Sequence, residues 1–295
     1  MLNGMLAGLG LGLLLAFGLE YLDNTLKTPD DVRKHLGAPM LGVIAENQTK
    51  TPGPVLLGIR PTGSFSEGYR VLRTSLNYCW PEAGPRVLAV TSTAPGEGKT
   101  LTSVNLALTL ASTEGKVLLI DADLRRPQAH TLLNAQRRPG LSDVLVGRTK
   151  PSDAVQRVAN LSFLSSGTRA PSPADLMTSP VLEGLLGGLR GYYNWIVIDT
   201  PPVAAVADAL IIARATDGVV VVIGAEMVPQ GSVAKTLERV AETGARVLGV
   251  VLNRAQTQRY GYSYGHYGHY YGRYYGHSAH SEGDQKVTPI RRRSS

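Results

Sequence analysis

Short, predominantly apolar runs that alternate with longer helical patterns constrain the fold of this chain more than any other feature. Runs this apolar are typical of strands buried on both faces, and such strands form parallel sheets joined by crossover helices. The sequence therefore predicts an α/β fold with a doubly wound, mostly parallel sheet. The predicted strands are 87–90, 117–120, 161–164, 196–198, 219–223 and 247–252.

A glycine-rich loop follows the first of these runs. The segment 91–100, TSTAPGEGKT, lies between a predicted strand and the helical pattern of 101–111, which is the context that a phosphate-binding loop requires. Its glycines let backbone N–H groups turn toward phosphates, the lysine reaches the β- and γ-phosphates, and the threonine hydroxyl binds Mg²⁺. The usual motif has glycine where Thr93 stands, and a chance glycine-rich turn is the alternative. The predicted nucleotide-binding residues here are Pro95, Gly96, Glu97, Gly98, Lys99, Thr100 and Leu101.

Three aspartates lie at the ends of two other predicted strands. Asp121 and Asp123 follow the strand at 117–120, and Asp199 follows the strand at 196–198. Because the carboxyl ends of the strands in a doubly wound sheet converge on the ligand crevice, we expect the three carboxylates to face the phosphate loop. There they can hold Mg²⁺ and polarise an attacking hydroxyl. Taken singly, each aspartate is more often a turn or cap residue, and it is their combination with the loop that favours a metal site.

These motifs, STAPGEGKT, LLIDADLRRP and IVIDTPP, resemble the Walker A, A′ and B motifs of the bacterial tyrosine kinases (BY-kinases) that govern capsule and exopolysaccharide export. The resemblance covers residues 63–254 and implies a P-loop NTPase fold and ATP-dependent phosphorylation of tyrosine, chiefly autophosphorylation. It implies that Lys99 and Thr100 bind the Mg-nucleotide, that Asp123 and Asp199 organise the metal with Thr100, and that Asp121 accepts the proton of the tyrosine hydroxyl. The division of roles among the three aspartates stays open. The residues expected to carry catalysis are Lys99, Asp121, Asp123 and Asp199.

The septum-site and plasmid-partition ATPases have a similar fold and form the rival class. They carry a second lysine in the loop, at the position of Ala94 in this chain, and they lack a tyrosine-rich tail. Both differences favour a kinase. A nucleotide-gated scaffold without kinase activity is the other alternative.

The composition changes abruptly after Asn253. Eight of the 13 tyrosines fall within 260–275 among glycines and histidines, so 258–295 is predicted to be a disordered tail. We expect this tail to be the substrate of autophosphorylation between copies, and each phosphate adds about −1.5 to −2 charges. A cohesive Tyr/Gly segment and a histidine metal site are the alternatives. The predicted phosphorylation sites are Tyr260, Tyr262, Tyr264, Tyr267, Tyr270, Tyr271, Tyr274 and Tyr275.

Two further features gain a role from the resemblance. A capping-box spacing predicts a helix that begins at Ser64. On that helix Glu67, Arg70 and Arg73 form an ExxRxxR pattern, which builds the subunit contacts of a ring in the family; a solvated charged stripe is the alternative. Asn253 follows the last predicted strand, where family members place an asparagine against adenine, although asparagine equally suits a turn.

The first 19 residues carry no charged side chain, and a helix of that length spans roughly 28 Å, so 1–19 is predicted to be a transmembrane helix. A signal peptide or a buried helix is the alternative. Residues 20–60 are expected to be a juxtamembrane activating segment and linker, and 61–257 the kinase domain. This places the protein in the inner or plasma membrane with a single pass and a cytoplasmic kinase domain. In the family, the kinase either follows two membrane helices in one long chain or is a soluble protein with a separate membrane activator. This sequence matches neither arrangement, so it is expected to be either a fragment of a longer chain or a chain whose partner supplies the missing helix and external domain.

Charge and cysteine content exclude two classes. The chain carries a net charge of +7, of which the last 37 residues supply +4, so the body is only mildly basic and no nucleic-acid partner is expected. Cys79 is the single cysteine, which excludes an intrachain disulfide and a Cys-rich metal site. The expected cofactors are ATP and Mg²⁺. The expected partners are other copies of the chain, a membrane polysaccharide co-polymerase or activator, and a tyrosine phosphatase.

Overall fold

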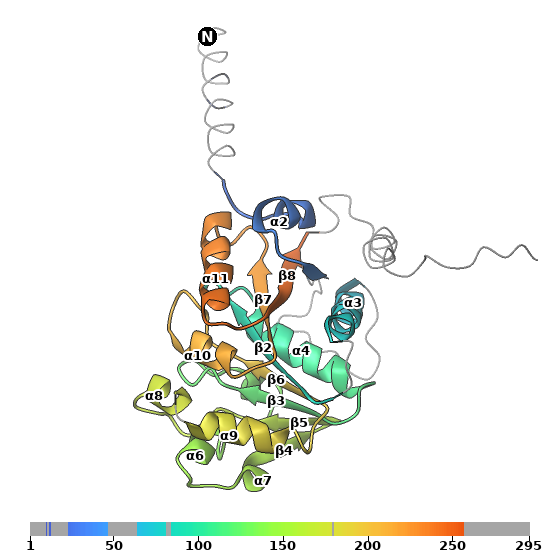
Figure 1. Cartoon of the computed structure of the whole chain (residues 1–295). Helices are drawn as coiled ribbons and strands as arrows, with labels where there is room; N and C mark the ends of the chain where they lie inside the picture. The colour runs from blue at the N-terminus through green and yellow to red at the C-terminus, as the bar shows by residue number, and fades with distance from the viewer. Residues whose placement is uncertain are drawn as a thin grey trace, which may run out of the picture. The chain divides into compact units, whose positions relative to one another are not determined.

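The computed structural model describes residues 23–46, 64–80, 84–178 and 180–256, together with the isolated positions 10 and 12. Its strands are β1 (Met40–Ala45), β2 (Arg86–Ser92), β3 (Val117–Asp121), β4 (Val155–Val158), β5 (Leu161–Leu164), β6 (Trp195–Asp199), β7 (Gly218–Gly224) and β8 (Val247–Ala255). They form one sheet with the order β1-β8-β7-β2-β6-β3-β5-β4, and within the described ranges β4 alone runs antiparallel to its neighbour (Figure 1). The predicted α/β class with a mostly parallel sheet is confirmed.

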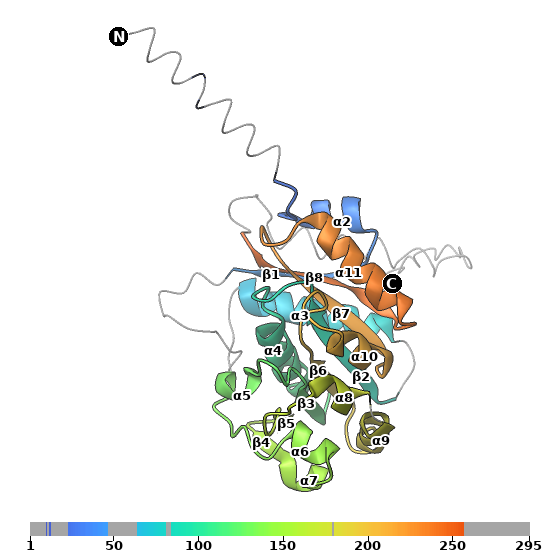
Figure 2. The same ribbon diagram turned by 90° about the vertical axis from the view of Figure 1, so that its left-hand side faces the viewer.

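Helices cover both faces of this sheet (Figure 2). On one face, α3 (Ser64–Cys79), α4 (Lys99–Ala111) and α5 (Ala129–Leu132) pack on a cluster that includes Leu88 and Val90. Val87 and Ala89 point to the opposite face, so successive residues of β2 alternate between the two cores. The helices of that opposite face are α2 (Pro29–Leu36), α6 (Leu141–Leu145), α7 (Pro151–Ala154), α8 (Pro173–Met177), α9 (Pro180–Leu189), α10 (Asp208–Arg214) and α11 (Gln230–Glu242).

All six predicted strands are present, and α3 begins at the predicted Ser64. The sequence analysis missed β1 and β4. The edge strand β4 carries Gln156 and Arg157 and is only partly buried, so it has no apolar run to reveal it. β1 lies in the stretch predicted to be a juxtamembrane segment and linker, yet it pairs in parallel with β8 at the opposite edge.

The backbone at Gly249 explains how β1 comes close to β8. Gly249 has φ 150°, and a Cβ there would lie 2.2 Å from the carbonyl oxygen of Pro39. That same oxygen accepts a hydrogen bond from the Val250 N–H at 2.8 Å. A residue with a side chain at this position would push the start of β1 away from the sheet.

Residues 23–36 are also built into the folded unit. Thr28 and Asp31 form a reciprocal capping box at the start of α2, and Gly37 ends the helix in the left-handed conformation. Val32 and Leu26 are buried in the cluster formed with α11 and β8. The division predicted at residue 61 therefore does not separate α2 and β1 from the sheet.

Two predicted segments lie outside the described residues. The predicted transmembrane helix 1–19 is described only at positions 10 and 12, and the predicted tail 258–295 is not described at all. Among the residues that are described, no helix combines the length and the apolar character needed to cross a membrane.

The position of β1 in the core leads to a prediction for stability. Leu41 is 1% exposed and belongs to the cluster under α3, so Leu41→Ala is expected to lower the free energy of unfolding by about 2–5 kcal/mol. Val146→Ala, at a side chain that is 46% exposed, should change it by less than about 0.5 kcal/mol. Urea unfolding of the two variants makes the comparison, and equal midpoints would show that β1 is not part of the core.

Candidate nucleotide-binding site

The phosphate loop, residues 93–98, joins the end of β2 to the start of α4. Gly98 stands at the N-cap of α4 in the left-handed conformation, and no side chain caps the helix. Because glycine has no side chain to cap the helix, the first N–H groups of α4 find no side-chain acceptor in the N-cap residue and carry the positive end of the helix dipole. Backbone N–H groups in this arrangement form an anion-binding site.

Hydrogen bonds of Glu97 and Asn253 fix the conformation of the phosphate loop. The Glu97 carboxylate accepts hydrogen bonds from the N–H groups of Ala94 at 2.6 Å and Gly224 at 3.1 Å, and its side chain is fully buried. Burial raises the pKa of this carboxyl, although the backbone hydrogen bonds act in the opposite direction. Asn253, in β8, donates from Nδ2 to the Glu97 carbonyl oxygen at 2.8 Å. Glycine suits position 98 because its φ of +92° is one that residues with a side chain rarely adopt, and a Cβ there would lie 2.1 Å from Asn253 Nδ2.

Lys99 makes the central charge contacts of the site. Its Nζ donates to Asp123 Oδ2 at 2.9 Å and to Thr100 Oγ1 at 3.2 Å, and it lies 4.0 Å from Asp199 Oδ2. Burial alone would lower the pKa of Lys99, but the charges of Asp199 and Asp123 outweigh it and raise the pKa. The lysine therefore stays protonated at neutral pH, which is the form that binds phosphate.

The strand ends bring the aspartates to this lysine, as predicted from their positions. Asp199 pairs in register with Val90 of β2 on one side and with Asp121 of β3 on the other. Ser103 of α4 donates to Asp199 Oδ1 at 3.0 Å. Asp123 lies beyond the end of β3, and its Oδ1 accepts the Arg126 N–H at 3.0 Å.

Asp121 is the partner of Asp199 in the neighbouring strand. It is fully buried, and its Oδ2 accepts the Ala129 N–H at 3.2 Å. Burial, followed by the nearby charges of Asp199 and Asp123, raises its pKa well above the usual value. Burial likewise raises the pKa of Asp199, whereas Lys99 opposes that shift. Three carboxylates with one lysine form a site that is poised to accept further positive charge.

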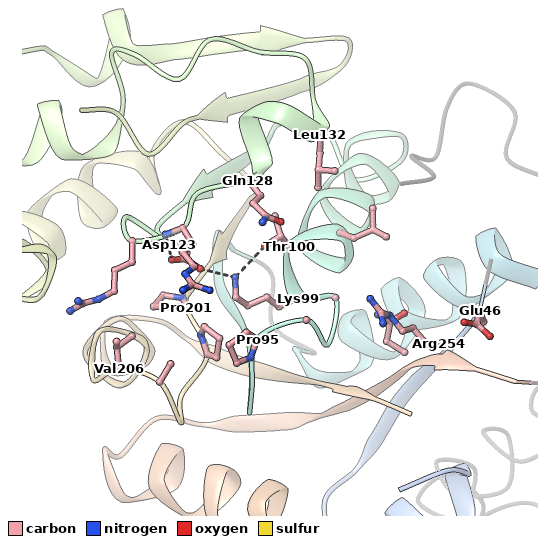
Figure 3. Close-up of a pocket in the computed structure, with 18 of the residues that line it drawn as sticks. Glu46, Pro95, Lys99, Thr100, Asp123, Gln128, Leu132, Pro201, Val206 and Arg254 are labelled. Carbon is pink, nitrogen blue, oxygen red and sulfur yellow. Dashed lines mark hydrogen bonds and ion pairs between the residues drawn. The ribbon is translucent and has the colours of Figure 1, made fainter. Parts of the chain in front are cut away.

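A cavity of about 930 Å³ opens over the phosphate loop (Figure 3). Of the predicted residues, Pro95, Gly96, Gly98, Lys99, Thr100, Leu101, Asp123 and Asn253 line it. Glu97, Asp121 and Asp199 are not part of its lining. Residues that sequence reasoning did not assign to the site are Ala45, Glu46, Phe65, Arg125, Arg126, Gln128, Leu132, Pro201, Pro202, Ala205, Val206 and Arg254. Several of these lie within or next to the quoted motifs, and Phe65 lies in the capping-box segment at the start of α3. Ala45, at the end of β1, and Glu46, directly after it, belong to no quoted motif.

The side-chain oxygens of the site suit Mg²⁺ when nucleotide phosphates supply further ligands. In the described part of the chain, Asp199 Oδ2 is buried without a hydrogen-bond partner, and the Thr100 hydroxyl lies in the cavity. No three acidic, His or Cys side chains group to hold a metal among the described residues. Mg²⁺ commonly binds through one or two carboxylates together with substrate phosphates, so this set would hold the ion only with phosphates present.

Three sets of predicted residues remain: the charged residues of α3, Asn253 and the tail tyrosines. Glu67 and Arg70 form an exposed ion pair of 3.0 Å on α3, and Arg73 donates to Thr113 Oγ1 at 2.9 Å. Asn253 lies within β8 rather than in a turn, so the turn alternative is wrong. The eight predicted phosphorylation sites lie outside the described residues.

Comparison with known proteins agrees with this geometry. The family profile described as ParA: NUBPL iron-transfer P-loop NTPase matches residues 85–284. Tyrosine-protein kinase YwqD of Bacillus subtilis (strain 168) is 36% identical over 213 residues, which cover 70% of this chain and 90% of that protein. EpsB of Ralstonia solanacearum is 32% identical over 271 residues, which cover 88% of this chain and 36% of that protein. The chain thus spans about a third of the length of EpsB.

Solved structures of both rival classes superpose on this chain, and the kinase domain does so with the higher TM-score. The kinase domain of Escherichia coli tyrosine kinase ETK superposes with a TM-score of 0.72 at 28% identity, over 78% of this chain and 95% of that chain. The septum site-determining protein MinD of Pyrococcus horikoshii OT3, complexed with Mg-ADP, superposes with a TM-score of 0.51 at 26% identity, over 58% of this chain and 70% of that chain. Fold and site together define a ParA-like P-loop NTPase. Within that class, the chain belongs to the bacterial tyrosine kinase family.

The contact between Asn253 and the phosphate loop gives a prediction for nucleotide binding. Asn253→Ala leaves the Glu97 carbonyl without its donor, and an unpaired buried carbonyl costs about 1–3 kcal/mol. We expect the affinity for Mg-ATP to fall roughly tenfold or more, as measured by calorimetry. Asn77→Ala, which removes a hydrogen bond to Glu114 far from the loop, is the matched control and should bind normally. Equal affinities for the two variants would show that Asn253 does not support the loop.

The buried carboxyl of Asp121 gives a prediction for pH dependence. Because its pKa is raised in the folded protein, Asp121 favours folding while it is protonated. That contribution is complete below about pH 4, the unfolded value, and is lost as the pH rises through the folded value. Asp121→Asn cannot ionise, so it should be more stable than wild type by about 1–3 kcal/mol at pH 8, without nucleotide or Mg²⁺.

The difference in the free energy of unfolding between Asp121→Asn and wild type should shrink as the pH falls from 8 to 4. Urea unfolding between these pH values would measure it. Asp153→Asn, on the exposed helix α7, serves as the control and should follow the wild-type curve. A stability gain for Asp121→Asn that is equal at both ends of the range would contradict the titration of this carboxyl.

Proposed function

We propose that this chain is an ATP- and Mg²⁺-dependent protein-tyrosine kinase. It autophosphorylates its C-terminal tyrosine cluster between copies and so regulates ring assembly and exopolysaccharide or capsule polymerisation and export. One observation carries the proposal: Lys99 and Asp123 line a cavity over an uncapped helix N-terminus, with Asp199 directly behind them. Membership of the tyrosine kinase family supports the same activity.

Each group has a task in phosphate transfer. The N–H groups of the phosphate loop and the Lys99 ammonium bind the phosphates, and adenine lies toward Asn253. Mg²⁺, when held by Thr100, Asp123 and Asp199, would neutralise charge on the phosphates. The tyrosine oxygen bonds to the γ-phosphorus, the bond from that phosphorus to the β–γ bridging oxygen breaks, and ADP leaves with the electron pair. The phenol proton passes to an aspartate, for which Asp121 is proposed from the family resemblance. Because Asp121 is buried and does not line the cavity, the proton would reach it through a bridging water. Burial raises the pKa of its carboxyl, which makes the carboxylate a stronger base.

The exposed face of α3 supports the assembly part of the proposal. An exposed ion pair such as Glu67 with Arg70 contributes little to stability, so these side chains are available for contacts between copies. Phosphates added to the tails carry about −1.5 to −2 charges each, and the accumulated charge would drive the copies apart. We place the protein at the inner or plasma membrane with the kinase in the cytoplasm, next to a polysaccharide co-polymerase or activator, and a tyrosine phosphatase resets it.

The decisive measurement is intact and peptide mass spectrometry after incubation of the full chain in detergent with Mg-ATP. We expect mass steps of one phosphate that map to 260–275 in wild type and are absent in Lys99→Met. ATP binding without any phosphotyrosine would instead indicate a nucleotide-gated scaffold.

A variant with phenylalanine at all eight tail tyrosines is the matched control for the assembly step. It keeps the aromatic rings but cannot gain charge, so its oligomers should persist in Mg-ATP while wild-type oligomers dissociate, as followed by light scattering. Dissociation of both at the same rate would contradict the charge mechanism.

A further inference from the structure

Positive charge is concentrated at one edge of the sheet. Residues 137–169 hold six basic and two acidic side chains, a net charge of +4, whereas all residues before 259 together carry only +3. The remainder of the body is therefore slightly acidic. The segment 137–169 includes α6, α7, β4 and β5 and the loops around them. We call its five exposed cations the basic edge: Arg138, Arg148, Lys150, Arg157 and Arg169.

The two acids of this segment do not neutralise the basic edge. Asp143 is buried, and its Oδ2 accepts hydrogen bonds from the N–H groups of Gly140 at 3.1 Å and Thr168 at 3.0 Å. Asp153 is then the single exposed acid of the segment beside five exposed cations. The ion pairs found within the described ranges involve none of the five. Like charges without acidic partners repel one another, so an anionic ligand would stabilise this surface.

Hydrogen bonds hold the segments of the basic edge together. The Gln136 N–H donates to Gln156 Oε1 at 2.9 Å, and Gln156 Nε2 donates back to the Gln136 carbonyl oxygen at 2.7 Å. This pair ties the loop after α5 to β4. The Gly167 N–H donates to the Arg137 carbonyl oxygen at 3.1 Å, which ties the same loop to the loop after β5. A hollow of about 620 Å³ lies between the loop and β4, and Arg157 lines it.

The position of the basic edge disfavours lipid headgroups as its anion. β4 and β1 are the two outermost strands of the sheet, and seven strand spacings between them amount to about 34 Å. In Figures 1 and 2, β4 and α7 lie at one end of the sheet and α2 lies at the other. A membrane anchor before residue 23 would join the protein at the α2 end, so the basic edge would face away from it.

The C-terminal tail reverses the sign of its charge when its tyrosines are phosphorylated. Residues 259–295 carry a net charge of +4 when unmodified, so the basic edge repels them. Each phosphotyrosine adds about −1.5 to −2 charges, so eight of them would bring the tail to roughly −8 to −12. Guanidinium groups bind phosphate with two parallel hydrogen bonds, and four of the five cations are arginines. The basic edge therefore discriminates between the two states of the tail.

The length of the tail lets its distal tyrosines reach the basic edge of the same chain. Six strand spacings separate β8 from β4, which is about 29 Å. The 19 residues from Gln256 to Tyr275 span about 22–26 Å as a flexible chain and up to roughly 65 Å when extended. Tyr260, four residues after Gln256, extends no further than about 14 Å. The distal tyrosines, which have the reach, are Tyr270, Tyr271, Tyr274 and Tyr275.

We propose that the basic edge is the binding site for the phosphorylated tail of the same chain. The inference rests on the proposed function and adds what happens to its product. After phosphate transfer between copies, each tail binds its own basic edge, where the phosphate oxygens accept hydrogen bonds from the arginines and the lysine. A tail held in this way is withdrawn from neighbouring copies. Its capture therefore acts in the same direction as the charge repulsion that separates them.

The first measurement is the affinity of the basic edge for a tail peptide. The protein is the full chain in detergent, without ATP and with phenylalanine at all eight tail tyrosines, so that its own tail cannot compete. The probe is a fluorescent peptide of residues 260–275 with phosphate on the four distal tyrosines, and an unphosphorylated twin is the reference. Anisotropy gives the Kd. Two double variants of the edge are compared with a control that reverses two exposed cations on α10 and α11: Lys150→Glu with Arg157→Glu, Arg138→Glu with Arg169→Glu, and the control Arg214→Glu with Lys235→Glu.

We expect each edge variant to raise the Kd for the phosphopeptide at least tenfold, whereas the control stays within twofold and the unphosphorylated peptide does not bind. The two edge variants alter different segments, so one keeps the test valid if the other does not fold. Equal Kd values for the edge variants and the control would overturn the site. A single-stranded RNA of similar length that binds the edge as tightly as the phosphopeptide would assign it to nucleic acid and would also overturn the proposal.

The second measurement asks whether the tail occupies the edge of its own chain. Wild type that has been phosphorylated with Mg-ATP, checked by mass spectrometry and freed of nucleotide should bind the phosphopeptide at least tenfold more weakly than the phenylalanine chain, because a tethered tail competes at high effective concentration. The same phosphorylated protein should displace no peptide from the phenylalanine chain. Displacement would show that tails bind other copies and would contradict the proposal. Phosphotyrosine without self-competition would reject this site alone, whereas absence of phosphotyrosine would reject the proposed function itself.

Discussion

The structure depends on one buried ionic contact, in which the Lys99 ammonium meets Asp123 at 2.9 Å and Asp199 at 4.0 Å. Removing an ion from water costs several kcal/mol unless opposite charges and hydrogen bonds compensate. Compensation here requires that β2, β3 and β6 end side by side and in register, because each strand delivers one part of the cluster. The strand order of the sheet therefore determines whether the charges of the site can compensate one another. A parallel sheet buried on both faces supplies the rigid frame that holds these charges at fixed separations.

Sequence reasoning predicted the centre of the fold and of the site because local patterns encode them. Apolar runs reveal strands that are buried on both faces, and the spacing GEGKT reveals the loop between β2 and α4. β1 and β4 were missed for different reasons, because β4 is only partly buried whereas β1 is an apolar run that was assigned to a linker. In β4 the apolar residues form no run and alternate only weakly with polar ones. β1 follows a short helix that the sequence did not separate from the preceding segment. Pairing between residues 40 and 250 is a property of the tertiary fold, which no local window contains.

The roles of individual site residues were harder to predict than their presence. Glu97 belongs to the nucleotide loop in sequence, yet its carboxylate binds the N–H groups of Ala94 and Gly224 and shapes the loop from within. Asp121 belongs to the acidic motif, yet it is fully buried and does not line the cavity. In both cases burial decides what the side chain does, and burial depends on neighbours that are distant in sequence. The motif identifies the residues, whereas the packing around them sets their chemistry.

The pairing of β1 with β8 has a consequence for any shortened form of this chain. β8 carries Asn253, which donates to the phosphate loop, and β1 covers the outer row of β8 backbone groups. A chain that starts after residue 46 would leave a central, apolar strand with a free hydrogen-bonding edge. Such edges recruit strands from other molecules, so the same six residues that complete the sheet also protect the protein against self-assembly through its edge.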